Sequence, residues 1–331
     1  MVNDEFYLSL ALTEAWKYQL LIYPNPPVGA LIVDKYGKIL SISAHKKQGE
    51  AHAELECVKE AYISLTKDKS IENIKDASKI HQYLLQNHNN LFKDSKIFVT
   101  LEPCNHYGST PPCSLLIAKL GFSEVIIGST EKNKKAMGGV KTLKENGIKV
   151  KCGVLKKECD QLIEPFLKWQ KRRFVFFKMA QNLNGTYDTG VISSKESRKF
   201  VHKLRDKIDL LVIGGNTVRT DRPTLDSRLV DGKSPDVMIY SKKKEFDKNI
   251  PLFSVKGRKV FVSDDLEDIK KYRFVMIEGT ESLMREFEDI VDWYLFFISC
   301  NIKRGNAITL DKELKTLHCD RYATDLMLWL K

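Results

Sequence analysis

The sequence predicts an α/β protein of two domains. Its 331 residues exceed the length of one typical domain. Short apolar stretches alternate along the chain with segments of helical periodicity, as expected where strands and helices pack in layers. This alternation restarts near residue 150. We therefore expect domains at 1–150 and 151–331, the first being a three-layer unit with a largely parallel or mixed sheet.

The first domain is expected to open with a helix over residues 4–22. Leu8, Ala11, Leu12 and Ala15 recur at helical spacing and so share one face. The helix should end before segment 23–27, which contains three prolines. A hairpin follows, because two short apolar runs flank a turn at 34–37. The strands expected in this domain are 28–33, 38–43, 97–101, 125–128 and 150–154, and the helices are 51–64, 78–86 and 111–120.

The second domain repeats the strand and helix alternation. Ser194 is suited to cap the helix that follows it. The strands expected in the second domain are 174–180, 210–214, 237–240, 259–262, 274–277 and 294–299, and the helices are 158–170, 195–207 and 281–288.

Residues 65–95 in the first domain are polar and irregular, which indicates a surface insertion or a loop that binds a partner.

Composition excludes several classes of protein. Apolar residues make up 43% of the chain without a run of about 18, so no transmembrane helix and no membrane partner are expected. Seven cysteines, with no export signal apparent, indicate a reducing cytoplasmic location. The net charge of +11 fits a nucleic-acid partner or a phosphorylated substrate, but the scattered lysines favour a solvated surface.

One group of residues has the composition of a catalytic zinc site. His52, Cys104 and Cys113 offer one imidazole and two thiolates, and each lies near the start of a predicted helix. Three protein ligands leave one position for water, whose pKa zinc lowers to about 7. Glu54 would be a carboxylate that moves protons without binding the metal, as in zinc deaminases. A structural zinc is the main alternative, and Cys57 is expected to be a core residue.

The surrounding sequence resembles the bifunctional riboflavin-biosynthesis deaminase-reductase family. The resemblance lies in YPNPPVGA (23–30), AH (44–45), GEAHAE (49–54) and TLEPCNHYGSTPPC (100–113). Eight residues separate the two cysteines, whereas cytidine and transfer-RNA adenosine deaminases usually have two. The resemblance implies a cytidine-deaminase-like domain with one Zn²⁺ on His52, Cys104 and Cys113. It also implies that Glu54 is the proton shuttle.

The same resemblance implies a pyrimidine pocket beside the zinc, lined by Asn25, His45 and His106. Asn25, considered by itself, could equally be a turn residue. The family usually has arginine at the position of Ser109, which is one departure in this half of the chain.

The second half resembles the reductase domain of this family at 174–180, 194–206, 212–228 and 277–279. That domain is similar to dihydrofolate reductase in fold and uses NADPH. Glycines after an apolar strand and before a helix suit a phosphate group, although the sequence has no G-x-G-x-x-G motif there. The resemblance implies substrate contacts at Arg205, Leu225, Arg228 and Glu278, and cofactor contacts at Lys178, Ala180, Thr217, Asp221, Gly279 and Thr280.

Several positions in this half depart from the family pattern. The usual Ser-Leu-Asp-Gly is Asn182-Leu183-Asn184-Gly185, the segment after it is shorter and lacks a tryptophan, and the usual Glu-Gly-Gly ends in Thr280.

The resemblance implies two successive steps of riboflavin synthesis. The first is deamination of 2,5-diamino-6-(5-phosphoribosylamino)pyrimidin-4-one, and the second is NADPH-dependent reduction of its ribosyl group to ribityl. We expect a phosphorylated pyrimidine as the substrate and a homo-oligomer as the assembly, and no nucleic acid as a partner. Two alternatives stay open: a deaminase whose second domain is degenerate and only binds a nucleotide, and a transfer-RNA-type nucleic-acid deaminase.

Overall fold

The computed structural model describes residues 2–108, 111–131 and 136–331, which form two compact units divided after Phe166. The division lies beyond the expected boundary at 150 because the helix α6 (Lys156–Lys171) packs its first half on the first unit. Cys159 and Leu162 are buried, and the Gln19 side chain donates to the Leu162 carbonyl at 2.7 Å. None of the helices in the described ranges is long and apolar enough to span a membrane.

A five-stranded mixed sheet forms the centre of the first unit, with strand order β2-β1-β3-β4-β5. The strand β1 is antiparallel to both of its neighbours, and β3, β4 and β5 are parallel. The strands are β1 (Gly29–Val33), β2 (Ile39–Ala44), β3 (Lys96–Leu101), β4 (Glu124–Ser129) and β5 (Lys149–Cys152). The helices are α1 (Asp4–Trp16), α2 (Ala53–Thr66), α3 (Ala77–Asn87), α4 (Cys113–Leu120), α5 (Gly139–Glu145) and α6.

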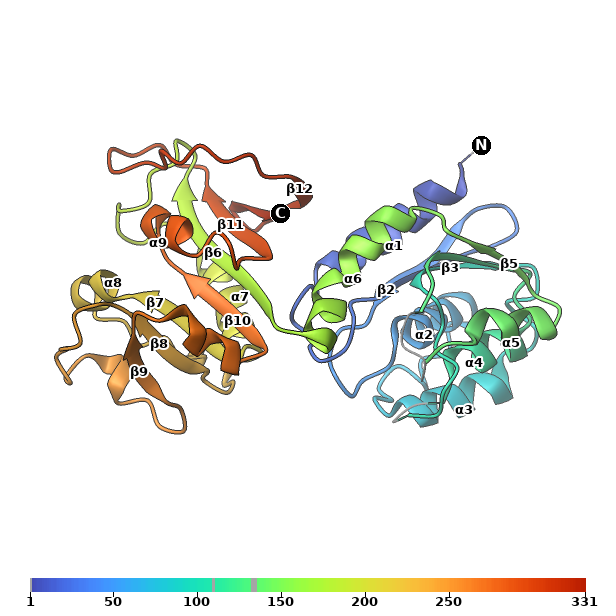
Figure 1. The fold of residues 1–331 in the computed structure, drawn as a ribbon. Coiled ribbons are helices and arrows are strands. Elements are labelled where there is room, and N and C mark those ends of the chain that lie inside the picture. The colour runs from blue at the N-terminus through green and yellow to red at the C-terminus, as the bar shows by residue number, and fades with distance from the viewer. Residues whose placement is uncertain (1, 109–110, 132–135) are drawn as a thin grey trace. The chain divides into compact units, whose positions relative to one another are not determined.

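Helices cover both faces of this sheet, as Figure 1 shows. On one face Leu8 of α1 and Cys159 of α6 pack with Leu31 and Phe98 of the sheet. A larger apolar core on the other face joins the sheet to α2, α3 and α4. The predicted three-layer α/β arrangement is therefore confirmed.

The first unit differs from the expectation in three places. The helix α1 ends at Trp16 rather than at residue 22, because Leu20 takes a left-handed φ of 64° and the chain turns. The helix expected at 78–86 forms as α3, but the insertion that contains it is not only a surface segment, because its Ile80 and Phe92 are buried in the core. The short helix α5 was not expected.

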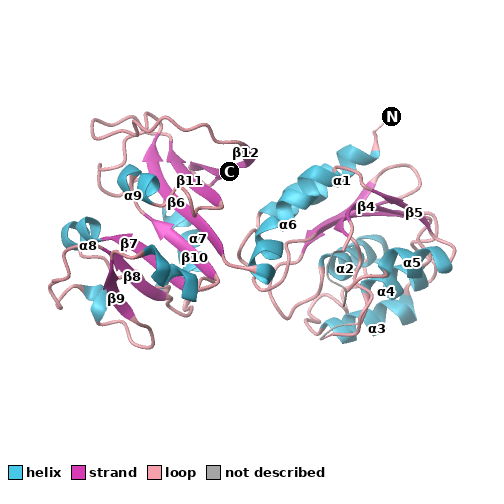
Figure 2. Cartoon of the chain, in the orientation of Figure 1, coloured by secondary structure: helices cyan, strands magenta, loops and turns pink. Residues whose placement is uncertain are grey.

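The second unit contains an eight-stranded sheet of order β12-β13-β11-β6-β10-β7-β8-β9 (Figure 2). The six strands from β11 to β9 are parallel, and the β12–β13 hairpin is antiparallel. The strands are β6 (Phe174–Asn182), β7 (Leu210–Gly214), β8 (Asp236–Tyr240), β9 (Val260–Ser263), β10 (Phe274–Glu278), β11 (Trp293–Ser299), β12 (Thr316–Tyr322) and β13 (Asp325–Leu330). The α-helices are α7 (Lys195–Arg205), α8 (Gly215–Asp221) and α9 (Glu281–Glu286).

All six parallel strands were expected, whereas α8 and the terminal hairpin were not. The hairpin has a structural role, because buried Asp325 at the start of β13 accepts bonds from the Ser194 amide (2.8 Å) and the Ser197 hydroxyl (2.6 Å). Ser194 itself caps α7 as predicted, accepting from the Ser197 amide. These contacts fix the helix that carries Arg205 to the sheet.

Candidate functional site

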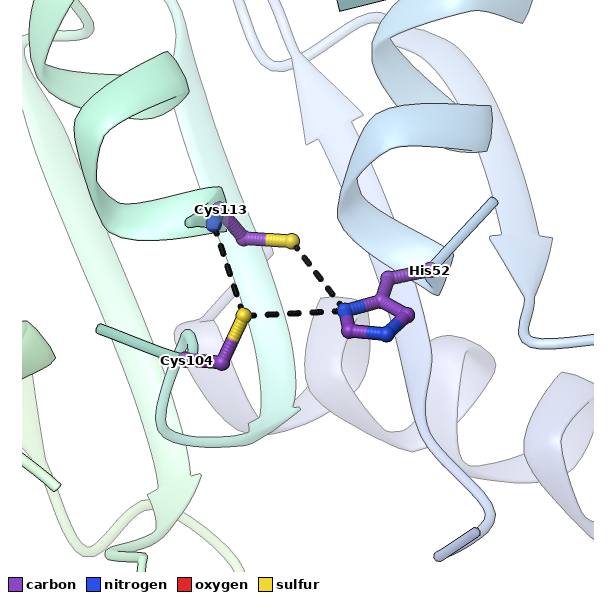
Figure 3. Close-up of side chains that lie close together, drawn as sticks. All are labelled: His52, Cys104 and Cys113. Atoms are coloured by element: carbon purple, nitrogen blue, oxygen red, sulfur yellow. Dashed lines mark hydrogen bonds between the residues drawn. The ribbon is translucent and has the colours of Figure 1, made fainter. Parts of the chain in front are cut away.

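Three side chains from distant parts of the first unit meet at the starts of two helices (Figure 3). His52 is the N-cap of α2, Cys113 is the first residue of α4, and Cys104 follows β3. The imidazole Nδ1 lies 3.6 Å from the Cys104 Sγ and 3.5 Å from the Cys113 Sγ. The fold thus brings together the three residues that the sequence predicted as metal ligands.

The donor set and its spacing fit a zinc ion. Zinc bonds of about 2.3 Å to sulfur and about 2.0–2.1 Å to nitrogen, at tetrahedral angles, place nitrogen and sulfur about 3.6 Å apart. The two measured Nδ1–Sγ distances are 3.6 and 3.5 Å. The three donors leave one corner of such a tetrahedron for a water or substrate atom.

The electrostatics of the cluster favour a thiolate. A hydrogen bond from the Cys113 thiol, together with His52, holds the pKa of Cys104 well below its usual range despite burial. The Cys113 amide at the start of α4 also donates to the Cys104 Sγ at 3.5 Å. A thiolate is the form of cysteine that binds a metal.

Glu54 lies in the first turn of α2, two residues after His52, and is 4% exposed. Its carboxyl is within hydrogen-bonding reach of the Cys113 thiol. Burial, reinforced by Cys104, raises the pKa of Glu54 to about 7. A carboxyl with that pKa can both accept and donate a proton at neutral pH.

Two residues not singled out in the sequence hold the loop that carries Cys104. The buried Glu102 carboxylate accepts from the amides of Glu131 and Val140, each at 3.0 Å. The Asn105 side-chain oxygen accepts from the hydroxyls of Ser114 (2.7 Å) and Thr142 (2.9 Å). Both residues flank the Pro-Cys motif, and this position was the only signal for them in the sequence. Two of their four partners, Val140 and Thr142, belong to α5, which was not expected.

His45 and Asn25 form a hydrogen-bonded pair beside the cluster. His45 Nδ1 lies 3.0 Å from the Ala51 carbonyl and must donate to it, so Nε2 accepts from the Asn25 amide at 3.1 Å. The His45 and His52 rings are 5.5 Å apart, edge to face. Burial lowers the pKa of His45, which favours this neutral form. The Asn25 side chain therefore bonds to His45, which lies outside the turn that contains Asn25.

The remaining expected pocket residue, His106, is exposed on the segment after Cys104. Ser109 lies outside the residues that the structure describes.

The second unit has a cavity of about 960 Å³ at the carboxyl ends of its parallel strands. That edge of a parallel sheet is where ligands bind in α/β proteins. Nine of the ten residues expected to contact substrate or cofactor line it: Lys178, Ala180, Arg205, Thr217, Asp221, Leu225, Glu278, Gly279 and Thr280. The tenth, Arg228, is exposed outside this lining and pairs with Asp226 at 2.8 Å.

Glu278 joins two cations on the floor of this cavity. Its two carboxylate oxygens accept from Lys178 Nζ at 2.9 Å and from Arg205 Nη2 at 2.8 Å. Burial alone would raise the pKa of the Glu278 carboxyl, but Lys178 and Arg205 hold it well below its usual range. The carboxylate is therefore charged at neutral pH. It fixes the positions of Lys178 on β6 and of Arg205 at the end of α7.

The structure adds cavity-lining residues that were not expected, among them Tyr187, Asp188 and Asn306. The Asp188 carboxylate accepts from both the backbone amide (2.8 Å) and the side-chain amide (2.7 Å) of Asn306. Asn184, one of the positions that differ from the family pattern, likewise donates to the Lys303 carbonyl at 2.8 Å. These contacts join segments more than one hundred residues apart, so no local pattern could indicate them.

Two family models match the chain. The cytidine and deoxycytidylate deaminase zinc-binding region matches residues 1–129, and the RibD C-terminal domain matches residues 173–320. The two matches cover the metal cluster and the cavity respectively. They confirm the two predicted fold types and identify the first unit as a zinc-binding deaminase domain.

Curated relatives match across both units. The riboflavin biosynthesis protein RibD of Aquifex aeolicus is 35% identical over 244 residues, covering 71% of this chain and 61% of that protein. RibD of Bacillus amyloliquefaciens is 32% identical, covering 71% of this chain and 58% of that protein. The chain thus spans about three fifths of these relatives' length.

A solved structure from Thermotoga maritima is similar over nearly the whole chain. It is described as a diaminohydroxyphosphoribosylaminopyrimidine deaminase/5-amino-6-(5-phosphoribosylamino)uracil reductase. The TM-score is 0.65 at 26% identity, with 99% of this chain and 98% of that chain covered. Both units, in the same order and within one chain, match one kind of protein, and the chain belongs to the bifunctional riboflavin-biosynthesis deaminase-reductase family.

Proposed function

We propose that the first unit deaminates 2,5-diamino-6-(5-phosphoribosylamino)pyrimidin-4-one and that the second unit reduces the ribosyl group of the product. The observation that carries this proposal is the convergence of His52, Cys104 and Cys113 beside buried Glu54. A structural zinc site has no need of the carboxyl, since it is closed by four protein ligands. The relatives' printed names support the choice of a phosphorylated pyrimidine.

His52, Cys104 and Cys113 would hold the zinc ion, which supplies a Lewis acid and a water of lowered pKa. Glu54 would take a proton from the attacking water and deliver it to the leaving amine. Asn25 and His45 would orient the pyrimidine, since their mutual hydrogen bond fixes which polar atoms face it. His106 would complete the pocket from the exposed segment after Cys104.

In the second unit NADPH would supply the hydride to C1′ of the ribosyl group. Lys178, Ala180, Thr217, Asp221, Gly279 and Thr280 would contact the cofactor, and all six line the cavity. The volume of about 960 Å³ suits a dinucleotide and a second ligand together. Arg205, Leu225 and Glu278 would bind the substrate, with the Arg205 cation available to its phosphate or hydroxyl groups. Arg228, on the exposed surface nearby, would reach only the end of that substrate.

The cellular setting follows the same reasoning. We propose a cytoplasmic enzyme, because none of the seven cysteines forms a disulfide. A homo-oligomer remains our proposal for the assembly.

The test incubates zinc-loaded protein with the diaminopyrimidine, with and without NADPH, and reads the products by mass spectrometry. We expect deamination in both samples and reduction only with NADPH. Deamination without reduction would overturn the second activity and leave a deaminase with a nucleotide-binding module. No reaction would overturn the proposal, and binding of RNA with steep salt dependence would support the nucleic-acid alternative.

A further inference from the structure

The cavity wall formed by residues 222–226 has an irregular backbone. Arg222 and Leu225 have φ values of 46° and 55°, in the left-handed region. A residue with a side chain is disfavoured there by roughly 1–2 kcal/mol. Pro223 and Leu225 nevertheless line the cavity, and Leu225 is buried. Other groups must therefore hold this wall in place.

Arg258 contacts the wall from behind. It precedes β9 and is outside the cavity lining. Its guanidinium donates to the carbonyl oxygen of Thr224 from Nη2 at 2.7 Å and to that of Leu225 from Nη1. Nη2 also donates to the Leu252 carbonyl at 2.9 Å. One side chain thus ties the strained turn to a second segment through three neutral acceptors.

The same wall is held from the cavity side by Arg205. Its Nη1 donates to the Asp226 carbonyl at 3.3 Å while its Nη2 pairs with Glu278. The Leu252 amide donates to the Pro223 carbonyl at 3.0 Å. Four successive carbonyls, from residue 223 to residue 226, therefore have donors. The position of Leu225 depends on these donors rather than on regular secondary structure.

We propose that Arg258 is a positioning residue that sets the substrate-binding wall of the second unit. This inference rests on the proposed reductase function. Arg258 acts through the Thr224–Leu225 backbone. We expect it to affect binding of the substrate rather than of NADPH, because that backbone continues to Asp226, whose carbonyl contacts the proposed substrate residue Arg205. Burial lowers the pKa of Arg258 to about 10, so the side chain still carries its charge at neutral pH.

The geometry requires arginine rather than any cation. A guanidinium presents several donors in a fixed planar fork, whereas an ammonium is a single centre of charge. Arg258→Lys keeps the charge but cannot bridge Thr224, Leu225 and Leu252 with the same spacing. Arg321→Lys is a matched control, because Arg321 also donates to a backbone carbonyl, that of Ala323 at 3.1 Å, but is exposed and does not line the cavity.

The experiment measures NADPH-dependent reduction of 5-amino-6-(5-phosphoribosylamino)uracil by the full chain. Calorimetry without NADPH gives the substrate Kd, and a separate titration gives the NADPH Kd. We expect Arg258→Lys to raise the substrate KM and Kd roughly tenfold, since charge-assisted hydrogen bonds are lost. The kcat and the NADPH Kd should change little, and Arg321→Lys should match the wild type. In Arg258→Gly, added guanidinium ion should lower the raised KM.

Two results would overturn the inference. One is an Arg258→Lys enzyme with wild-type substrate KM and Kd. The other is a variant with a lower Tm whose folded fraction retains wild-type affinity, which would show a structural role only. Failure of the proposed function is distinguishable, because the wild-type chain itself would then neither bind nor reduce this substrate.

Discussion

Replacing Glu278 by glutamine removes the shared anion of a nearly buried three-residue network. The Lys178 and Arg205 side chains are each 10% exposed and that of Glu278 is 18% exposed. Breaking a buried ion pair by removing one partner typically costs 3–5 kcal/mol, because the remaining charge is left uncompensated. The glutamine oxygen can still accept from one cation, so we expect a loss of about 3 kcal/mol in the free energy of unfolding.

Tryptophan fluorescence during urea unfolding provides the assay, since Trp169, Trp293 and Trp329 all lie in the second unit. The control is Glu288→Gln, because Glu288 pairs with Lys312 at 3.4 Å with side chains 47% and 26% exposed. An exposed pair of that kind contributes about 0–1 kcal/mol. A Glu278→Gln loss no larger than that of the control would refute the reasoning.

Three further predictions concern acid stability, packing and metal binding. The folded-state pKa of Glu278 is depressed, so its stabilisation is complete above the unfolded value near 4.3 and is lost as the pH falls below it. Urea midpoints at pH 5 and pH 3 should therefore fall more for the wild type than for Glu278→Gln, and parallel falls would contradict this. Gly29→Ala places a Cβ 2.0 Å from the Ala11 carbonyl oxygen, so we expect the first unit to lose about 1–3 kcal/mol, measured by calorimetry; an unchanged melt would count against the packing. Cys113→Ser should reduce the zinc content well below the expected roughly one ion per chain, and retention of full zinc by elemental analysis would exclude that ligand.

Much of the fold could be predicted from local patterns. Buried parallel strands such as β7 and β10 are continuous apolar runs, which are visible without any knowledge of their neighbours. The β12–β13 hairpin was missed because β12 is largely polar and only partly buried at the sheet edge. The early end of α1 depends on Leu20 taking a left-handed conformation, which leucine itself does not indicate.

The site could be predicted where its residue types are chemically unusual. A histidine and two cysteines near predicted helix starts identified the cluster. The cavity of the second unit is lined by the residues for which the resemblance implied substrate and cofactor contacts, apart from Arg228. The supporting network could not be predicted, because Glu102 and Arg258 act on backbone groups that only the tertiary fold brings near. An isolated glutamate or arginine in the sequence is compatible with an ordinary surface position.

The most direct test of the account compares zinc content and deamination in the wild type and in Glu54→Gln. We expect both proteins to hold about one zinc ion per chain, because Glu54 is not a ligand. The variant should lose roughly 10²–10⁴-fold in deamination rate, the usual contribution of a positioned proton-transfer group. Glu54→Gln with equal zinc and a wild-type rate, or a zinc-loaded wild type that leaves the diaminopyrimidine unchanged, would contradict the central claim.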